Sequence, residues 1–579
     1  MKFHHVVIII TLVLTVVMLF LDQENNPGPE LVVVSSIIDY AILTLIIVEI
    51  ISSIFSVRYP FMYIREHLFS FVSVAVFFIV FMVVNAQTAW QLPRGAESLV
   101  LLVLFVRNTV LTLRIFGRIQ KLAHYVENMT IRPAQTILQS FIFVILSGTF
   151  LLMMGFSTTD GMGLHFIDAL FTSTSAVCVT GLIVVDTATA FTFLGKLIIM
   201  LLIQVGGLSI MVLSYAALFA LRRKTSLADK LLLSYMLSEE DAKSFSRSLK
   251  TMIYSTIIIE GTGAVLLFMG FSPTMGVSFG TFFYSLFHSI SAFCNAGFAL
   301  FSNNLESYRT SPIIPATIAG LIILGGISFA VILNVRDILA YRIRRVFSKN
   351  PGKPEQLNVN SVVVLAGTLI LIVSGMLMIY FLEHGRAMKD YSLGDQYYSA
   401  FFQSVTLRTA GFNTIPLGNL AGATYLLMIV YMFIGAASGG TAGGIKINTV
   451  ALILARIRGM LRGESQVRLG NYYISSERVA RSFIVLIFAL SSIVLGTFFM
   501  LVFDEGDYLK ILFEATSAFG TVGLSAGITS GLSWMSKLVL VFLMYFGRVG
   551  PLTILVAVGK KDQAQATKIQ YPRGDISIG

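Results

Sequence analysis

The chain has 579 residues, of which 56% are hydrophobic and only 12% are charged. Soluble proteins carry roughly 25% charged residues, so this composition excludes a soluble fold and indicates an integral membrane protein. The net charge of +11 does not indicate nucleic-acid binding, because lysines and arginines lie between apolar segments and not in one patch. Cys178 and Cys294 are the only cysteines, too few for a disulfide framework or a thiolate metal site.

Twelve continuous apolar segments predict transmembrane helices, whereas a barrel would show short alternating segments. These segments lie at residues 6–21, 32–56, 68–85, 98–113, 136–155, 191–221, 251–271, 312–333, 361–382, 421–455, 479–503 and 533–558. The first follows Lys2 and has no small-residue cleavage site after it, so we expect a membrane anchor and not a signal peptide.

Lysine and arginine concentrate in every second connection, at residues 222–250, 336–353 and 456–481. Basic loops mark the cytoplasmic side. We therefore expect a multi-pass protein of the cell (inner) membrane with both termini cytoplasmic. The same loops would also suit docking of an acidic partner, although topology alone explains them equally well.

A repeated pattern fills the gaps between paired spans beyond residue 130. Each gap holds a short apolar stretch that ends in a glycine, at Gly181, Gly297, Gly411 and Gly523. The four copies share one period, which chance does not readily produce. Each copy predicts a short helix followed by an extended segment that stops inside the membrane.

Non-helical backbone is tolerated at membrane depth only where protein or water surrounds it. We therefore expect the four segments to face one another around a wet axis, where backbone carbonyls replace the hydration shell of a cation. The negative C-terminal ends of the short helices would favour the same cation. The alternative is a set of re-entrant loops that pack a transporter and bind nothing. The candidate ion-binding residues are Val179, Thr180, Gly181, Asn295, Ala296, Gly297, Thr409, Ala410, Gly411, Thr521, Val522 and Gly523.

Three residues before the repeated glycine, the first two copies carry Cys178 and Cys294, and the third carries Arg408. We interpret the cysteines as small packing residues behind the ion-binding segment. A buried arginine there would repel a cation unless it is neutralised. We therefore expect a carboxylate partner for Arg408, with Glu514 and Asp168 as candidates.

Four motifs make the chain resemble the Trk/Ktr/HKT superfamily of potassium transporters, most closely the Ktr-type membrane subunit. They lie at residues 179–182, 204–211, 408–414 and 547–553, and the resemblance extends over about residues 133–560. It implies an all-α polytopic membrane protein with four potassium-channel-like M1-P-M2 repeats in a pseudo-four-fold arrangement. Here four additional transmembrane helices precede the repeats. The expected units are residues 1–125 (four-helix module), 133–224, 248–350, 358–460 and 476–560 (repeats 1 to 4), and 561–579 (cytosolic tail).

The resemblance further implies potassium uptake across the plasma membrane through a selectivity filter. It also implies a homodimer in membrane lipid and a separately encoded cytosolic ring of nucleotide-binding regulatory subunits. The nucleotide would bind that ring, because no Gly-x-Gly-x-x-Gly fingerprint follows a strand in this chain. We expect no cofactor here beyond the transported K⁺, with Na⁺ as a second possible ion, and no nucleic acid partner.

A glycine-rich run at 435–444 interrupts the tenth span, and glycine costs a helix roughly 1 kcal/mol per residue, so the helix should unwind there. The family places a gating loop at this point in the third repeat, and an arginine like Arg548 beneath the filter as an electrostatic barrier. The alternatives are a close helix contact through small residues and a structural salt bridge of Arg548. The candidate gating residues are Gly439, Gly440, Thr441, Ala442, Gly443, Gly444, Lys446 and Arg548.

The module before residue 125 has acids within its second span and basic residues along its fourth. Arg107, Arg114 and Arg118 are spaced by seven and then four residues, whereas voltage sensors repeat an arginine every third residue. Both a voltage-sensor-like module and a structural or docking module therefore remain open.

An intramembrane enzyme is not expected, because the histidines are scattered and no paired acids or His-Glu-x-x-His motif occur. All four repeated positions are glycine, and in this superfamily a serine at one of them accompanies Na⁺ permeability. The resemblance therefore favours K⁺. Because the residues before the glycines differ between copies, we expect one well-formed ion site and modest discrimination. The alternative function is a less selective K⁺/Na⁺ channel or transporter with a voltage-sensor-like N-terminal module.

Overall fold

The computed structural model describes residues 133–208, 242–347, 356–464, 466–470, 472–551 and 553–554. Internal contacts divide the chain into two units, residues 1–131 with 160–163, and residues 132–159 with 164–579. The account below concerns the second unit. The first four predicted spans, the voltage-sensor question and the tail at 561–579 lie outside the described residues.

The described chain is mostly helical, and its helices follow one order four times: a long or medium helix, a short helix, and a second apolar helix. The first set is α6 (Pro133–Leu152), α7 (Phe166–Val177) and α8 (Phe193–Gly207). The second is α11 (Ala242–Met275), α12 (Phe279–Phe293), α13 (Ile314–Gly326) and α14 (Phe329–Phe347). The third is α15 (Val359–Glu383), α16 (Leu393–Thr406), α17 (Gly422–Phe433) and α18 (Ile447–Leu461). The fourth is α19 (Ser476–Phe503), α20 (Tyr508–Gly520) and α21 (Trp534–Val549).

Polar caps fix where many of these helices begin. Thr192, Ser278, Ser392 and Ser533 each accept a hydrogen bond from the backbone N–H three residues ahead, at the starts of α8, α12, α16 and α21. Such caps satisfy an orphan donor of the first helical turn and contribute about 1 kcal/mol each. The apolar runs therefore start as helices at defined residues, and each short helix ends where its ion-binding segment was predicted.

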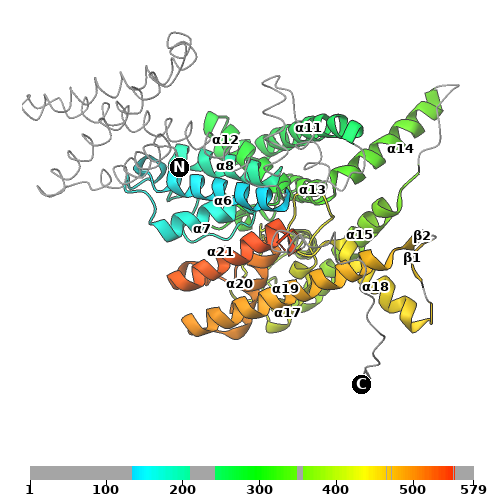
Figure 1. Cartoon of the computed structure of the whole chain (residues 1–579). Coiled ribbons are helices and arrows are strands. Elements are labelled where there is room, and N and C mark those ends of the chain that lie inside the picture. Colours follow the sequence, from blue (N-terminus) through cyan, green and yellow to red (C-terminus); the bar gives the residue numbers. More distant parts are fainter. Residues whose placement is uncertain are drawn as a thin grey trace, which may run out of the picture. The chain divides into compact units, whose positions relative to one another are not determined.

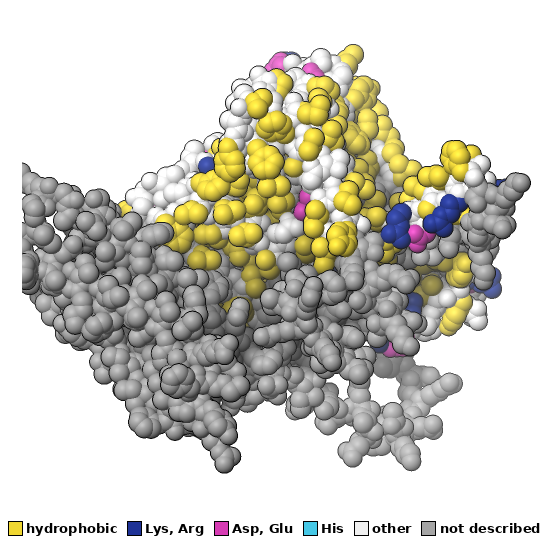
Figure 2. All heavy atoms as spheres, turned by 90° about the horizontal axis from the view of Figure 1, so that it is seen from above, with side chains coloured by type: hydrophobic (Ala, Val, Ile, Leu, Met, Phe, Trp, Pro, Cys, Tyr) yellow, Lys and Arg dark blue, Asp and Glu magenta, His cyan; other side chains and the backbone are white. Residues whose placement is uncertain are grey.

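Three described helices are long and apolar enough to cross a membrane: Met252–Met275 within α11, α15 and α19. Their outward side chains are apolar; Ile257, Leu369 and Val494 are each more than 60% exposed. Hydrophobic side chains spread over much of the described surface in Figure 2, and charged ones are few there. A surface of this kind requires a lipid environment, which agrees with the membrane protein expected from composition.

Contacts between successive sets close into a ring. The helix that follows the short helix in each set packs against the short helix of the next set: α8 on α12, α13 on α16, and α17 on α20. The last contact joins the two ends of the series, because α21 packs against α7 (Figure 1). The short helices are thus held side by side around a common centre.

Two predicted spans are interrupted. The break at the glycine-rich run is confirmed, since α17 ends at Phe433 and α18 begins at Ile447. The continuous span expected at 312–333 is wrong: α13 ends at Gly326, α14 begins at Phe329, and the two helices are bent by 102°. The paired glycines 325 and 326 end α13 there, and Ser328 accepts from the backbone N–H of Val331 as α14 begins.

A small hairpin departs from the all-helical expectation. Strands β1 (Val467–Leu469) and β2 (Tyr472–Ile474) pair antiparallel within the basic connection at 456–481. Valine, tyrosine and isoleucine favour strands, and the connection had been predicted only as a loop.

Candidate functional site

The four predicted ion-binding segments share one backbone conformation. Two residues before each repeated glycine, Val179, Asn295, Thr409 and Thr521 have φ values of 57°, 59°, 67° and 50°. The repeated glycines themselves have φ between 70° and 96°. The left-handed conformation costs a non-glycine residue about 1–2 kcal/mol, and three of the four are β-branched, so the surrounding packing must hold these turns in place.

The structure brings the four glycines together as neighbours in a closed ring. A methyl carbon placed on Gly181 would lie 2.4 Å from the carbonyl oxygen of Ala296. The same construction on Gly297 meets the oxygen of Ala410 at 2.9 Å. On Gly411 it meets the oxygen of Val522 at 2.6 Å, and on Gly523 that of Thr180 at 2.1 Å. Each glycine therefore faces the carbonyl that precedes the glycine of the next copy, and only a residue without a side chain fits.

This arrangement gathers backbone oxygens, and those are the donors available for a cation. Among the described residues, no group of three or more His, Cys, Asp or Glu side chains is placed to hold a metal ion. The hydroxyl oxygens of Thr180, Thr409 and Thr521 have no hydrogen-bond partner within the described part of the chain. Carbonyl and hydroxyl oxygens suit a weakly bound, readily exchanged monovalent cation.

The unwound segment 434–446, which we call the interhelical loop, lies against this ring. A methyl carbon on Gly443 would lie 2.0 Å from the Thr521 hydroxyl oxygen. Thr441 donates its N–H to the carbonyl of Gly325 and its hydroxyl to that of Phe293, at 3.1 Å each. Lys446 turns back and donates its ammonium group to the carbonyls of Ala442 and Gly443. Hydrogen bonds from Thr441 to the backbone carbonyls of Gly325 and Phe293 therefore fasten the interhelical loop to the second set of helices.

Arg548 ties the interhelical loop to the far side of the ring. Its guanidinium donates to the carbonyl of Thr441 in the loop and to those of Gly206 and Gly207 at the end of α8. These hydrogen bonds all go to backbone carbonyls, and no ion pair of Arg548 occurs among the described residues. The salt-bridge alternative therefore has no support in the described chain.

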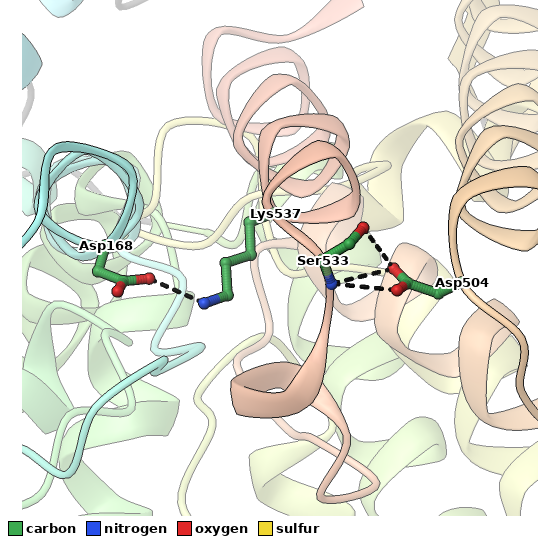
Figure 3. Close-up of polar contacts among 4 residues, drawn as sticks. All are labelled: Asp168, Asp504, Ser533 and Lys537. Atoms are coloured by element: carbon green, nitrogen blue, oxygen red, sulfur yellow. Dashed lines mark hydrogen bonds and ion pairs between the residues drawn. The ribbon is translucent and has the colours of Figure 1, made fainter.

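The expected partners of Arg408 are wrong. Asp168 pairs with Lys537 at 2.8 Å and thereby joins α7 to α21 (Figure 3). The Glu514 carboxylate accepts from the hydroxyls of Ser525 and Thr529 and from the N–H of Ala526.

Helix geometry explains the error for Asp168. Asp168 lies in the first turn of its short helix, whereas Arg408 follows the last turn of another. Ten residues of helix separate those two levels, about 15 Å along the axis. Arg408 is only 2% exposed, and its Nε and one terminal nitrogen have no hydrogen-bond partner in the described residues.

Both cysteines are free and fully buried, as expected for packing residues. Cys178 and Cys294 end α7 and α12, and a methyl carbon on Gly207 would lie 2.3 Å from the Cys294 sulfur. A small side chain is therefore required where α8 crosses the end of α12.

Sequence reasoning missed a contact outside the ring. Glu306, in a short 3₁₀ turn (Glu306–Tyr308), accepts a hydrogen bond from the side-chain amide of Asn413 at 2.8 Å. Burial raises the pKa of the Glu306 carboxyl, and the Asn413 hydrogen bond and the Arg309 guanidinium oppose that rise. These residues belong to different copies of the repeat and share no periodic pattern, so no signal in the sequence pointed to the pair.

The apolar spanning helices and the ring of backbone carbonyls define the class as multi-pass membrane transport proteins. Comparison with known proteins agrees. The model of the family described as "TrkH: Cation transport protein" matches residues 104–569. Ktr system potassium uptake protein B of Bacillus subtilis (strain 168) is 36% identical over 449 residues, which cover 77% of this chain and 97% of the relative. Potassium/sodium uptake protein NtpJ of Enterococcus hirae is 34% identical over 455 residues, with the same two coverages.

A solved structure supports the fold. The potassium transporter TrkH from Vibrio parahaemolyticus aligns with a TM-score of 0.60 at 17% identity, covering 84% of this chain and 97% of that chain. The chain belongs to the TrkH family of cation transport proteins and is a multi-pass membrane protein. The family match begins at residue 104, earlier than the start near residue 133 that the motifs had indicated.

Proposed function

We propose that this protein takes up K⁺ across the cell membrane through a selectivity filter made of the four glycine-containing segments. In this proposal each helix set is an M1-P-M2 repeat, in which the short helix is the pore helix. The four sets surround the pore with pseudo-four-fold symmetry, and both chain termini are cytoplasmic. The named relatives are potassium uptake proteins, which supports the choice of ion.

The closed ring of glycines carries the proposal. Each glycine meets the carbonyl of the next copy, and the contact between Gly523 and Thr180 joins the last copy to the first. Backbone carbonyls gathered in a ring would suit an ion that must bind and leave.

The interhelical loop is the proposed gate. It contacts Thr521 on one side and is held by Arg548 on the other, so its displacement would open the path beneath the filter. The cationic side chain of Arg548 would also raise an electrostatic barrier to a passing cation until the loop moves.

A second candidate is a pathway that carries both K⁺ and Na⁺. The relative from Enterococcus hirae is named a potassium/sodium uptake protein. The residues that precede the glycines also differ between copies, which makes the ring irregular.

A homodimer and a cytosolic ring of nucleotide-binding regulatory subunits complete the proposal.

The test is growth of a bacterial strain that lacks its own potassium uptake systems, in medium of low K⁺. The chain is expressed alone, with its regulatory subunit, and as Gly523→Ser. Rescue by the wild type that is lost, or replaced by Na⁺ uptake, in the variant supports the proposal. Absence of rescue by wild-type protein that is correctly inserted in the membrane, in every combination, contradicts it.

A further inference from the structure

Three of the four filter segments are fastened by a serine of their own short helix, six residues before the repeated glycine. Ser175 accepts from the N–H of Gly181 and donates to the carbonyl of Leu182. Ser291 donates to the carbonyl of Phe298, and Ser517 accepts from the N–H of Gly523. In the third copy Val405 stands at this position and has no hydroxyl.

The turn that leads into the third segment also differs. In the other copies the N–H of the residue before the glycine bonds to a carbonyl five residues back, as Thr180 does to Ser175. In the third copy Ala410 bonds to Thr406, only four residues back, and the Thr406 hydroxyl has no partner within the described residues. The third segment therefore lacks the internal fastening of its neighbours.

At the far ends of the segments, the second and fourth copies carry a further side-chain contact. His288 and Glu514 both stand nine residues before their glycine, and each accepts the N–H three residues after it, from Leu300 and Ala526 respectively. The hydroxyl of Thr172, at the same position of the first copy, has no hydrogen-bond partner in the described residues. The third copy has Phe402 at the same position, which cannot accept a hydrogen bond.

The third segment is instead fastened from the second set of helices, by residues 304–306, which we call the strap. Asn304 accepts from the N–H of Asn413 at 3.3 Å and donates to the carbonyl of Gly411 at 3.5 Å. Leu305, fully buried, donates its N–H to the carbonyl of Asn413 at 3.2 Å. The Glu306 carboxylate adds the last contact of the strap, a hydrogen bond that it accepts from the side-chain amide of Asn413.

The strap is itself anchored. Asn304 is held at φ 55°, a conformation that asparagine tolerates better than most residues. The guanidinium of Arg309 lies 4.4 Å from the centre of the Tyr391 ring, which attaches the end of this segment to the third set. The Arg309–Tyr391 contact therefore holds the chain just after the strap to the third set.

We propose that Asn304 and Glu306 are positioning residues, which hold the third segment at Gly411 and Asn413. They thereby keep the adjoining Ala410 carbonyl in the ring and set how well the filter distinguishes K⁺ from Na⁺. The inference rests on the proposed filter function. It assigns ion discrimination in part to residues outside the four segments, and it makes the position of the third segment depend on another repeat.

The test measures K⁺ and Na⁺ uptake of the full-length protein in the uptake-deficient strain, with its regulatory subunit present. Glu306→Ala removes one hydrogen bond to the third segment and Asn304→Ala removes two, so we expect each to lower the K⁺/Na⁺ uptake ratio by about three- to tenfold. Glu306→Gln should stay near the wild-type ratio, because its amide oxygen can still accept from Asn413. Asn413→Ala removes the Glu306 hydrogen bond from its other end and serves if Glu306→Ala does not fold.

Asp504→Ala is the matched control. Asp504 also fastens a loop to a neighbouring segment, through the N–H and hydroxyl of Ser533 (Figure 3), but that contact involves no filter residue. Its removal should lower thermal stability in detergent and leave the ratio unchanged.

The possible results distinguish failure of the inference from failure of the proposed function. An equal loss of discrimination in Glu306→Gln and Glu306→Ala would mean that the charge acts directly on the ion, which overturns a positioning role. Unchanged ratios in the alanine variants overturn the inference, while potassium uptake by the wild type leaves the proposed function standing. A wild-type protein that is inserted but takes up no K⁺ overturns both.

Discussion

The four ring glycines should differ in their sensitivity to an added side chain. A methyl carbon would lie 2.1 Å from a neighbouring carbonyl oxygen at Gly523, 2.4 Å at Gly181, 2.6 Å at Gly411 and 2.9 Å at Gly297. All four obstacles are backbone atoms, which cannot rotate away. Ordinary contact needs about 3.4 Å, so Gly523→Ala must displace its neighbour by roughly an ångström, and Gly297→Ala by about half as much.

The displacement moves a carbonyl that we assign to the ion. The K⁺/Na⁺ uptake ratio should fall by at least about tenfold in Gly523→Ala, equivalent to about 1.4 kcal/mol. It should fall progressively less in the alanine variants of Gly181, Gly411 and Gly297. All four glycines have positive φ and carry a similar backbone penalty, so that cost does not disturb the order.

The assay compares initial rates of K⁺ and Na⁺ uptake in the uptake-deficient strain, at matched expression of the four variants. The reverse order, or equal effects at all four positions, would refute the reasoning from contact distances. A loss of stability without a change in ratio would indicate that the ring is only a packing feature.

Three further predictions concern the gate and the packing around the ring. Deletion of residues 438–443 should raise K⁺ flux in the absence of the regulatory subunit, because the interhelical loop then no longer reaches the filter; unchanged or lower flux in a folded variant contradicts the gate. Arg548→Gln should also raise that flux, since a shorter neutral side chain cannot hold the loop and α8 together. Flux is measured in proteoliposomes at equal protein content, and a flux no higher than that of the wild type contradicts this prediction. Asp168→Asn and Lys537→Met should each destabilise the protein by about 1–3 kcal/mol, because each leaves a partly buried charge unpaired. Melting in detergent should show a double variant that loses less than the sum of the two; strict additivity would mean that the ion pair contributes nothing.

Periodic features of the site were predictable from the sequence. The repeated glycines mark positions where a side chain cannot fit, and this requirement leaves the same residue at the same spacing in every copy. The unwound loop was predictable for a related reason, since five glycines in ten residues weaken a helix whatever surrounds it.

Features that depend on a single long-range contact were not predictable. The bend after Gly326 was missed because the surrounding residues are as apolar as an unbroken span. The partner of Arg408 was wrongly predicted because both candidate carboxylates make other contacts, which no periodic pattern in the sequence marks. Asp168 pairs with Lys537, and Glu514 accepts hydrogen bonds from residues 525–529. Glu306 and Asn413 are 107 residues apart, and only the folded ring brings them together.

The central claim is that one K⁺ binds within the ring of carbonyls of Thr180, Ala296, Ala410 and Val522. The most direct measurement is anomalous diffraction from crystals of the protein grown with Rb⁺ in place of K⁺. The account predicts a strong peak enclosed by these four oxygens, and its loss in Gly523→Ala crystals. Absence of a peak there in protein that transports Rb⁺, or a peak at a different site, would contradict it.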